Sequence, residues 1–170
     1  MRNVIASDVL RLPTAACFTV STNQCDINGH FTVRHQLASF DDAAWNFLNG
    51  LGLGLTRMDH GRTFFDLEQH LTYRAEAQVM DALQIHCRLL DISSSTAHIM
   101  SYLVRPEDDV VISTLETLTL NVELAQRQST PFTNEEIERL SRRAIEDRRL
   151  AWASGACGAM QVRKSRLDEQ

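Results

Sequence analysis

Lysine is almost absent from this chain. Lys164 is its single lysine, although lysine and arginine together number 17 among 170 residues. Because Lys164 lies in the polar tail, we expect neither Schiff-base chemistry nor a lysine-containing phosphate loop. The net charge of −5 disfavours sequence-independent binding to DNA or RNA, which needs clustered positive charge. We therefore expect no nucleic-acid partner.

The sequence also lacks a run of about 20 apolar residues, the length that spans a bilayer. Residues 1–13 have neither the basic start nor the long apolar core of a signal peptide. We therefore expect a cytoplasmic protein that does not contact a membrane. The cysteines show no paired short spacing, so we expect reduced thiols and no metal site. They are Cys17, Cys25, Cys87 and Cys157.

Hydrophobic spacing predicts one long apolar helix in the first third of the chain. Residues 16–25, rich in Phe, Thr, Val and Cys, are typical of a strand that precedes it. The helix follows Thr32, a predicted N-cap whose hydroxyl would accept from a first-turn amide. The glycine-rich stretch 50–54 ends it. Its apolar face recurs at steps of three and four, at Leu37, Phe40, Ala44, Leu48 and Leu51.

Four strands and a second helix are predicted downstream. Apolar and polar residues alternate in 65–73 and 83–89, a period of two that is typical of half-buried strands. Two further strands are expected at 97–104 and 110–124, and short connections join the last three strands into an antiparallel meander. Thr133 and Glu136 form a capping box that starts a helix ending near Leu150.

These elements predict an irregular lead-in (1–15), a main domain (16–132), a helix (133–150) and a tail (151–170). One long helix wrapped by a curved antiparallel sheet of about five strands, an α+β fold, buries both apolar faces. A single copy would leave the other face of the sheet and its edges uncovered. We therefore expect a homodimer or a dimer of dimers.

The segment from Asp26 to His30 (DINGH) places a carboxylate on a sharp bend shortly before the helix begins. The free amides at a helix N-terminus can hold a developing oxyanion. Asp26, ionised at an ordinary pKa of about 3.9, can attack a carbonyl or activate water. A thioester is a suitable target. An Asx-type turn that only ends the strand accounts for the same residues, so both interpretations stay open.

Several segments share a pattern with one known family. They are Asp26, Gly29 and His30, the helix with Phe40, Asp42 and Ala43, the pair Tyr73-Arg74, and the exit at Pro131-Phe132. Together they resemble the hotdog-fold acyl-CoA thioesterases of the 4-hydroxybenzoyl-CoA type, whose motif is D-x-x-G-H-x-N-N-x-x-Y. The resemblance covers residues 18–132. It implies a hotdog fold and hydrolysis of an acyl-CoA, with coenzyme A as part of the substrate and no metal or redox cofactor.

The resemblance also implies roles for single residues. Asp26 would be the nucleophile or general base, the backbone N–H of Val33 would polarise the thioester carbonyl, and His30 would organise the loop. The residues implied to contact the substrate are Asn28, Gly29 and Thr32.

The chain departs from the motif at several positions. Thr32 and Val33 replace the two asparagines, residues 35–36 stand in place of tyrosine, and Met80 stands where glycine is common. These departures keep open a non-catalytic hotdog protein that binds an acyl-CoA or a partner without turnover. A dehydratase on the same fold is a second alternative, although its histidine-plus-acid arrangement on the helix is not evident.

Features downstream of the motif resemble the betainyl-CoA thioesterases of carnitine and betaine breakdown. These features are the LGL helix end, the strand at 65–74 and the tail after Pro131-Phe132. Such a substrate carries a quaternary ammonium, which binds aromatic ring faces, and a carboxylate is expected beside it. The side chains available for this are Trp45, Phe64, Phe65, Tyr73, Asp41 and Glu68.

Other residues remain alternatives. If Asp26 is not the reactive carboxylate, Asp41, Asp42 and Glu68 are in reserve. The phosphates of coenzyme A have three candidate partners: Arg57, Arg62 and Arg74. The glycines at 50–54 follow a helix rather than opening one, so we interpret them as helix termination instead of a phosphate loop. Three histidines on neighbouring strands are interpreted as packing rather than metal ligands: His70, His86 and His98.

Overall fold

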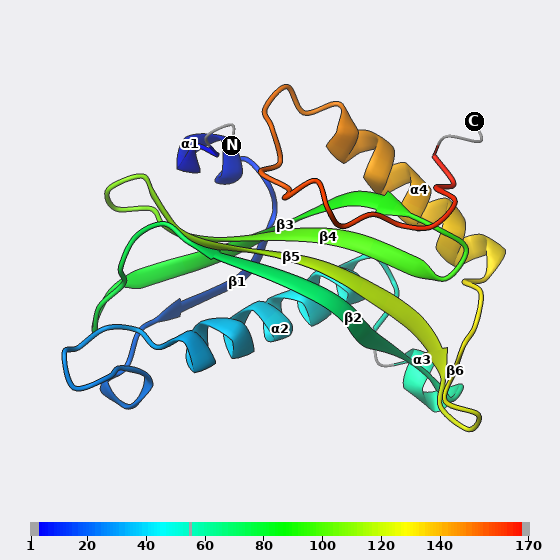
Figure 1. Cartoon of the computed structure of the whole chain (residues 1–170), viewed down its shortest axis with the longest axis horizontal. Coiled ribbons are helices and arrows are strands. Elements are labelled where there is room, and N and C mark those ends of the chain that lie inside the picture. The colour runs from blue at the N-terminus through cyan, green and yellow to red at the C-terminus, as the bar shows by residue number, and fades with distance from the viewer. Residues whose placement is uncertain (1–3, 55, 168–170) are drawn as a thin grey trace.

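The computed structural model describes residues 4–54 and 56–167, and its elements follow the predicted order (Figure 1). The helices are α1 (Ala6–Val9), α2 (Val33–Gly50), α3 (Thr56–Asp59) and α4 (Asn134–Arg148), with a 3₁₀ turn η1 (Thr22–Gln24). The strands are β1 (Thr14–Thr19), β2 (Arg62–Tyr73), β3 (Ala82–Ile92), β4 (Thr96–Arg105), β5 (Val110–Glu123) and β6 (Gln128–Ser129). None of the described helices is long and apolar enough to cross a bilayer.

The main sheet has the strand order β1-β3-β4-β5-β2, and every neighbouring pair is antiparallel. The predicted meander of β3, β4 and β5 is confirmed, and the short β6 pairs with β5. The sheet curves around α2, which packs against β1, β3 and β4 (Figure 1). This arrangement confirms the predicted hotdog fold.

The buried face of α2 differs slightly from the predicted one. Phe40 and Leu48 are buried as expected, but their companions are Gln36, Ala43 and Phe47, whereas Leu37 is exposed. Residues 36, 40, 43 and 47 still follow the helical repeat, so the helix is rotated by a fraction of a turn from the predicted orientation.

The segment before α2 corrects two local predictions. β1 ends at Thr19, and the residues predicted to continue it form η1, whose capping box joins Ser21 and Gln24. Thr32 occupies the N-cap position of α2, but its hydroxyl donates to the Gln24 carbonyl at 3.1 Å instead of accepting from the helix. The predicted hydroxyl cap is therefore wrong, because this side chain ties the loop to the 3₁₀ turn.

Segments near both ends of the described chain cover part of the outer face of the sheet, opposite α2 (Figure 1). α1 packs against β4, and a cluster of apolar side chains including Val9 and Tyr102 lies between them. The Tyr102 hydroxyl donates to the Ser154 carbonyl at 2.9 Å, and Met160 and Val162 pack on Leu118. The predicted irregular lead-in is therefore wrong, and the predicted lack of cover on the outer face is wrong over β4 and β5, whereas β2 remains exposed at residues 65–70. The outer edge of β2 is not paired with another described strand.

Candidate functional site

Asp26 lies at the centre of a tight turn. Its Oδ1 accepts from the backbone N–H groups of Asn28 at 2.8 Å and His30 at 2.9 Å. The turn is closed by Gly29, whose φ of +82° favours a residue without a Cβ. The Asx-type turn considered for this sequence is therefore present. Both of these amides bond to the same carboxylate oxygen, and neither contacts Oδ2.

The turn keeps Asp26 ionised. The N–H of His30 is the largest influence that lowers the pKa of Asp26 below its ordinary value; slight burial opposes it, and the N–H of Asn28 adds to the lowering. The His30 imidazole lies beside the other carboxylate oxygen, with Nδ1 3.8 Å from Oδ2, and its Nε2 is 3.4 Å from Oε2 of Glu76. His30 thus lies between two carboxylates, an arrangement consistent with an organising role in the loop.

The backbone N–H of Val33 is available to a ligand. Val33 is the first residue of α2, an 18-residue helix, and in the described chain its N–H has no acceptor. The Thr32 carbonyl accepts from the amides of His35 and Gln36, each at 3.0 Å. The Val33 amide therefore precedes the first hydrogen bonds of the helix. The helix dipole makes this end attractive to negative charge.

One cleft joins these groups. Asp26, His30, Thr32 and Val33 line a cleft of about 470 Å³, together with Tyr73 and other residues of the β2 end. Asp26 and Val33 therefore line the same space. Asn28 and Gly29 shape the turn and are not among the lining residues, so their contact with the substrate stays a prediction.

Gln36 is a buried polar residue that the sequence analysis treated only as a departure from the motif. Its Nε2 donates to the Phe31 carbonyl at 3.0 Å, and its Oε1 accepts from the Ser113 hydroxyl at 2.7 Å. It fixes the start of α2 to the loop and to β5. The sequence signal that could have identified Gln36 is its position one turn before Phe40, which places a polar residue on the apolar face of the helix.

A second cavity of about 500 Å³ lies between α2 and the sheet. Of the side chains considered for a quaternary ammonium, it is lined by Trp45, Phe64, Phe65 and Asp41. Tyr73 lies in the first cleft instead, and Glu68 lines neither. Asp66, which no sequence pattern singled out, also lines the cavity. A register shift between Asp66 and Glu68 breaks the period of two from which the face of Asp66 was inferred.

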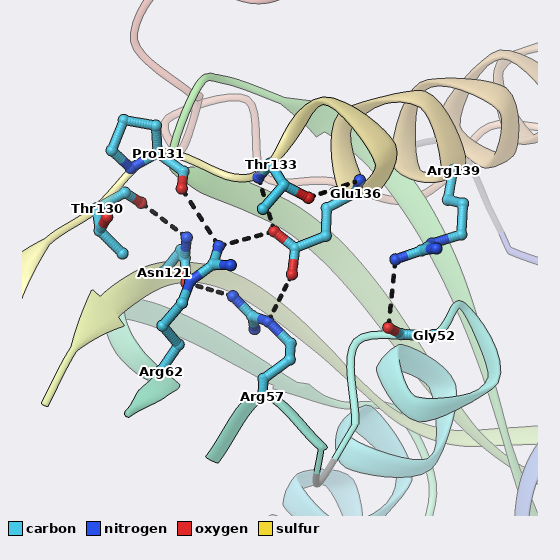
Figure 2. A network of polar contacts seen from close by, with 9 residues as sticks. All are labelled: Gly52, Arg57, Arg62, Asn121, Thr130, Pro131, Thr133, Glu136 and Arg139. Carbon is cyan, nitrogen blue, oxygen red and sulfur yellow. Dashed lines mark hydrogen bonds and ion pairs between the residues drawn. The ribbon is translucent and has the colours of Figure 1, made fainter. Parts of the chain in front are cut away.

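Two of the arginines proposed for coenzyme A belong to a buried network (Figure 2). Arg57 Nε contacts Glu136 Oε1 at 2.8 Å, and Arg62 Nη2 contacts Glu136 Oε2 at 2.7 Å. Arg57 also donates to the Asn121 side chain. Arg57 is only 5% exposed, so it is not placed to meet a phosphate. Arg74 is half-buried and remains a candidate.

The glycine-rich stretch and two of the histidines singled out in the sequence make contacts that stabilise the fold. The Gly52 carbonyl accepts from Arg139 Nη2 at 3.4 Å, in line with helix termination at 50–54 (Figure 2). His98 pairs with Glu116 at 2.8 Å, and His86 Nδ1 lies 2.9 Å from the Leu12 carbonyl oxygen. In the part of the chain that the structure describes, no group of three or more His, Cys, Asp or Glu side chains is arranged to hold a metal ion.

Comparison with known proteins agrees with this architecture. A betainyl-CoA thioesterase of Pseudomonas aeruginosa is 28% identical over 131 residues, covering 76% of this chain and 82% of that protein. An L-carnitine dehydrogenase/betainyl-CoA thioesterase of Rhizobium meliloti is 26% identical over 139 residues, covering 82% of this chain and 27% of that protein. The chain thus spans about a quarter of the length of such fused relatives.

A solved structure and a family model extend the comparison. A hypothetical protein from Staphylococcus aureus in complex with CoA superposes with a TM-score of 0.77 at 21% identity, covering 89% of this chain and 96% of that one. This likeness supports the fold. The family model described as the thioesterase-like superfamily matches residues 20–140, well over half of the sequence. The chain therefore belongs to the thioesterase-like superfamily, as the resemblance of its motif and elements indicated.

Proposed function

We propose that this protein hydrolyses a small acyl-CoA thioester to the free acid and coenzyme A. The observation that carries the proposal is the cleft that Asp26 and Val33 both line, together with the unpaired N–H of Val33. A carboxylate beside an unpaired helix-terminal N–H suits attack on a carbonyl, because the N–H stabilises the negative charge that develops on oxygen.

In this mechanism the thioester oxygen accepts from the Val33 N–H. Oδ1 of Asp26 stays bound to the loop amides, and Oδ2, which these amides do not contact, is the reacting oxygen. Oδ2 either takes a proton from an attacking water or attacks the carbonyl carbon itself, in which case water hydrolyses the resulting anhydride. In both routes the acyl–sulfur bond breaks, oxygen from water joins the acyl carbon, and a proton reaches the departing thiolate.

The acyl group that we propose is betainyl. Three relatives carry betainyl-CoA thioesterase in their names, and the second cavity supplies the aromatic rings and carboxylate expected for a quaternary ammonium. Because the identity to these relatives is low, the betainyl group is proposed separately from thioester hydrolysis. The two steps are tested by different esters.

Release of free thiol from a panel of acyl-CoA esters tests the activity. The panel contains betainyl, short-chain and aromatic esters, and we expect at least one to be hydrolysed well above the buffer rate. Tight binding of coenzyme A without release of thiol from any ester would overturn the proposal and favour the non-catalytic alternative.

We also propose that the protein works as a dimer, or a dimer of dimers, joined through β2. This 12-residue strand pairs with β5 on one side, and no described strand pairs with its other edge. Phe65, Leu67 and Tyr73 on this strand are exposed, at 39%, 58% and 47%. A long free strand edge with exposed apolar side chains is a template for another strand, and a second copy would pair antiparallel with it.

Leu67→Lys is expected to shift the protein from dimer toward monomer and to lower hydrolysis in parallel, because it places a charge at the proposed interface. Light scattering at micromolar concentrations measures the first effect. Ile5→Lys is the matched control, since Ile5 is exposed to a similar extent, 53%, but precedes α1 on the outer face. A wild-type protein that is monomeric at these concentrations would contradict the proposed dimer.

A further inference from the structure

We propose that the cavity between α2 and β2 binds the acyl group, and that Asp41 and Asp66 make it selective for an acyl group with a positive charge. This inference rests on the proposed thioesterase activity. Asp41, Ala44, Trp45 and Leu48 form the helix wall of the cavity. Their spacing of three, four and seven residues places them on one face of α2.

The opposite wall comes from the sheet. β2 contributes Asp66 and Gln69, while Ile99 of β4 and Leu115 of β5 give an apolar surface. Ile99 and Leu115 are almost fully buried, whereas Asp41 and Asp66 are exposed. The cavity therefore combines an apolar floor with two carboxylates near its mouth, a shape and polarity suited to a small group with a charged end.

The two carboxylates lack a positively charged partner. Neither Asp41 nor Asp66 takes part in an ion pair within the described ranges; Asp66 accepts only neutral hydrogen bonds, one of them from Gln69 Nε2 at 2.7 Å. Loss of hydration raises the pKa of Asp41, and the charge of Asp42 adds to it. Loss of hydration also raises the pKa of Asp66, and the charge of Asp41 contributes. A bound cation would relieve both effects.

Aromatic rings favour a cation that cannot donate hydrogen bonds. Trp45 packs edge-on against Phe64, with ring centroids 6.3 Å apart, and the Arg57 guanidinium already lies over the Phe64 ring at 4.3 Å. The other rings that line the cavity are those of Phe40, Trp45 and Phe65. A quaternary ammonium is attracted to such ring faces and to nearby carboxylates without needing a directed hydrogen bond.

The length of α2 favours a cavity that works with the Asp26 loop of a second copy. From Val33 to Asp41 the rise along α2 is about 12 Å at 1.5 Å per residue. The nitrogen of a betainyl group lies only two single bonds, each about 1.5 Å, from the thioester carbon. Antiparallel pairing of β2 with β2 of another copy places the Tyr73 end of one beside the Phe64 end of the other. Such a pairing would bring the cavity of one copy toward the Asp26 loop of the other.

The test compares two esters of nearly equal shape and different charge. Betainyl-CoA carries a trimethylammonium group, and 3,3-dimethylbutanoyl-CoA carries a tert-butyl group in its place. We expect the wild-type protein to favour the charged ester by at least tenfold in kcat/KM. Asp41→Asn and Asp66→Asn should each reduce this ratio severalfold to tenfold, because each removes one negative charge from the cavity.

Asp42→Asn is the matched control, since it removes the same charge from the neighbouring position of α2, which does not line the cavity. Its charged-to-neutral ratio should stay close to that of the wild type. Equal hydrolysis of the two esters by the wild type would overturn this inference while leaving the thioesterase proposal intact. Loss of both activities in Asp41→Asn would also overturn it, since Asp41 would then be the reactive carboxylate. Hydrolysis of no ester at all would remove both proposals.

Discussion

Asp26→Asn is expected to lower kcat/KM for the preferred thioester on the order of a thousandfold, within the range that a positioned acid or base contributes. The Asn side chain keeps an oxygen where Oδ1 accepts from Asn28 and His30, at 2.8 and 2.9 Å, so the turn survives. What is lost is the negative charge and the reactive second oxygen. Release of coenzyme A from the preferred ester measures the effect.

The comparison with Asp26→Ala separates chemistry from loop structure. Alanine removes both the charge and the acceptor of the two loop amides, so it should loosen the turn as well as abolish hydrolysis. Asp26→Asn should keep the thermal midpoint of the wild type and its affinity for coenzyme A. Full activity in Asp26→Asn would contradict the mechanism and would move the reaction to Asp41, the reserve carboxylate that lines a cavity.

The strands and the central helix could be predicted from the sequence because their signals are local. A period of two in β2 and β3, and steps of three and four in α2, follow directly from which side chains face the core. The covering of the outer face could not be predicted in this way. Val9 and Met160 belong to short segments without any period, and only contact with distant strands buries them.

In the candidate site, too, features with local sequence signals could be predicted, and features that depend on distant contacts could not. The turn at Asp26 and the start of α2 lie within eight residues, so one motif indicated the carboxylate and the Val33 amide. The Thr32 hydroxyl was assigned wrongly because its acceptor, the Gln24 carbonyl, lies in a 3₁₀ turn that the sequence did not reveal. Asp66 was missed because its position depends on a register shift against β5.

The short helix α3 and the role of α4 were also beyond local reasoning. Glu136 was recognised only as half of a capping box, which the structure contains: Glu136 Oε2 accepts from the Thr133 N–H at 2.8 Å. Its second role is to pair with Arg57 and Arg62, 79 and 74 residues away along the chain (Figure 2). No pattern in the sequence links residues so far apart.

Glu136→Ala is therefore expected to lower the free energy of unfolding by about 3–5 kcal/mol, as for other buried ion pairs that lose one partner. Glu136 is only 4% exposed. Burial alone would raise its pKa, but the Thr133 N–H and the two guanidinium groups hold the pKa below its ordinary value. Removing the carboxylate leaves the buried Arg57 charge without its ion-pair partner. Urea unfolding followed by circular dichroism measures the loss.

Glu138→Ala is the matched control on the same helix. Glu138 pairs with Arg142 at 3.1 Å, but both side chains are largely exposed, at 73% and 67%. Its loss should cost less than about 1 kcal/mol, because water screens exposed pairs. Glu136→Gln should fall between the two, since the amide can still accept from the Thr133 N–H but carries no charge for the arginines. Similar losses in Glu136→Ala and Glu138→Ala would show that the network stabilises the fold no more than a surface pair, and α4 would then be held by its apolar contacts alone.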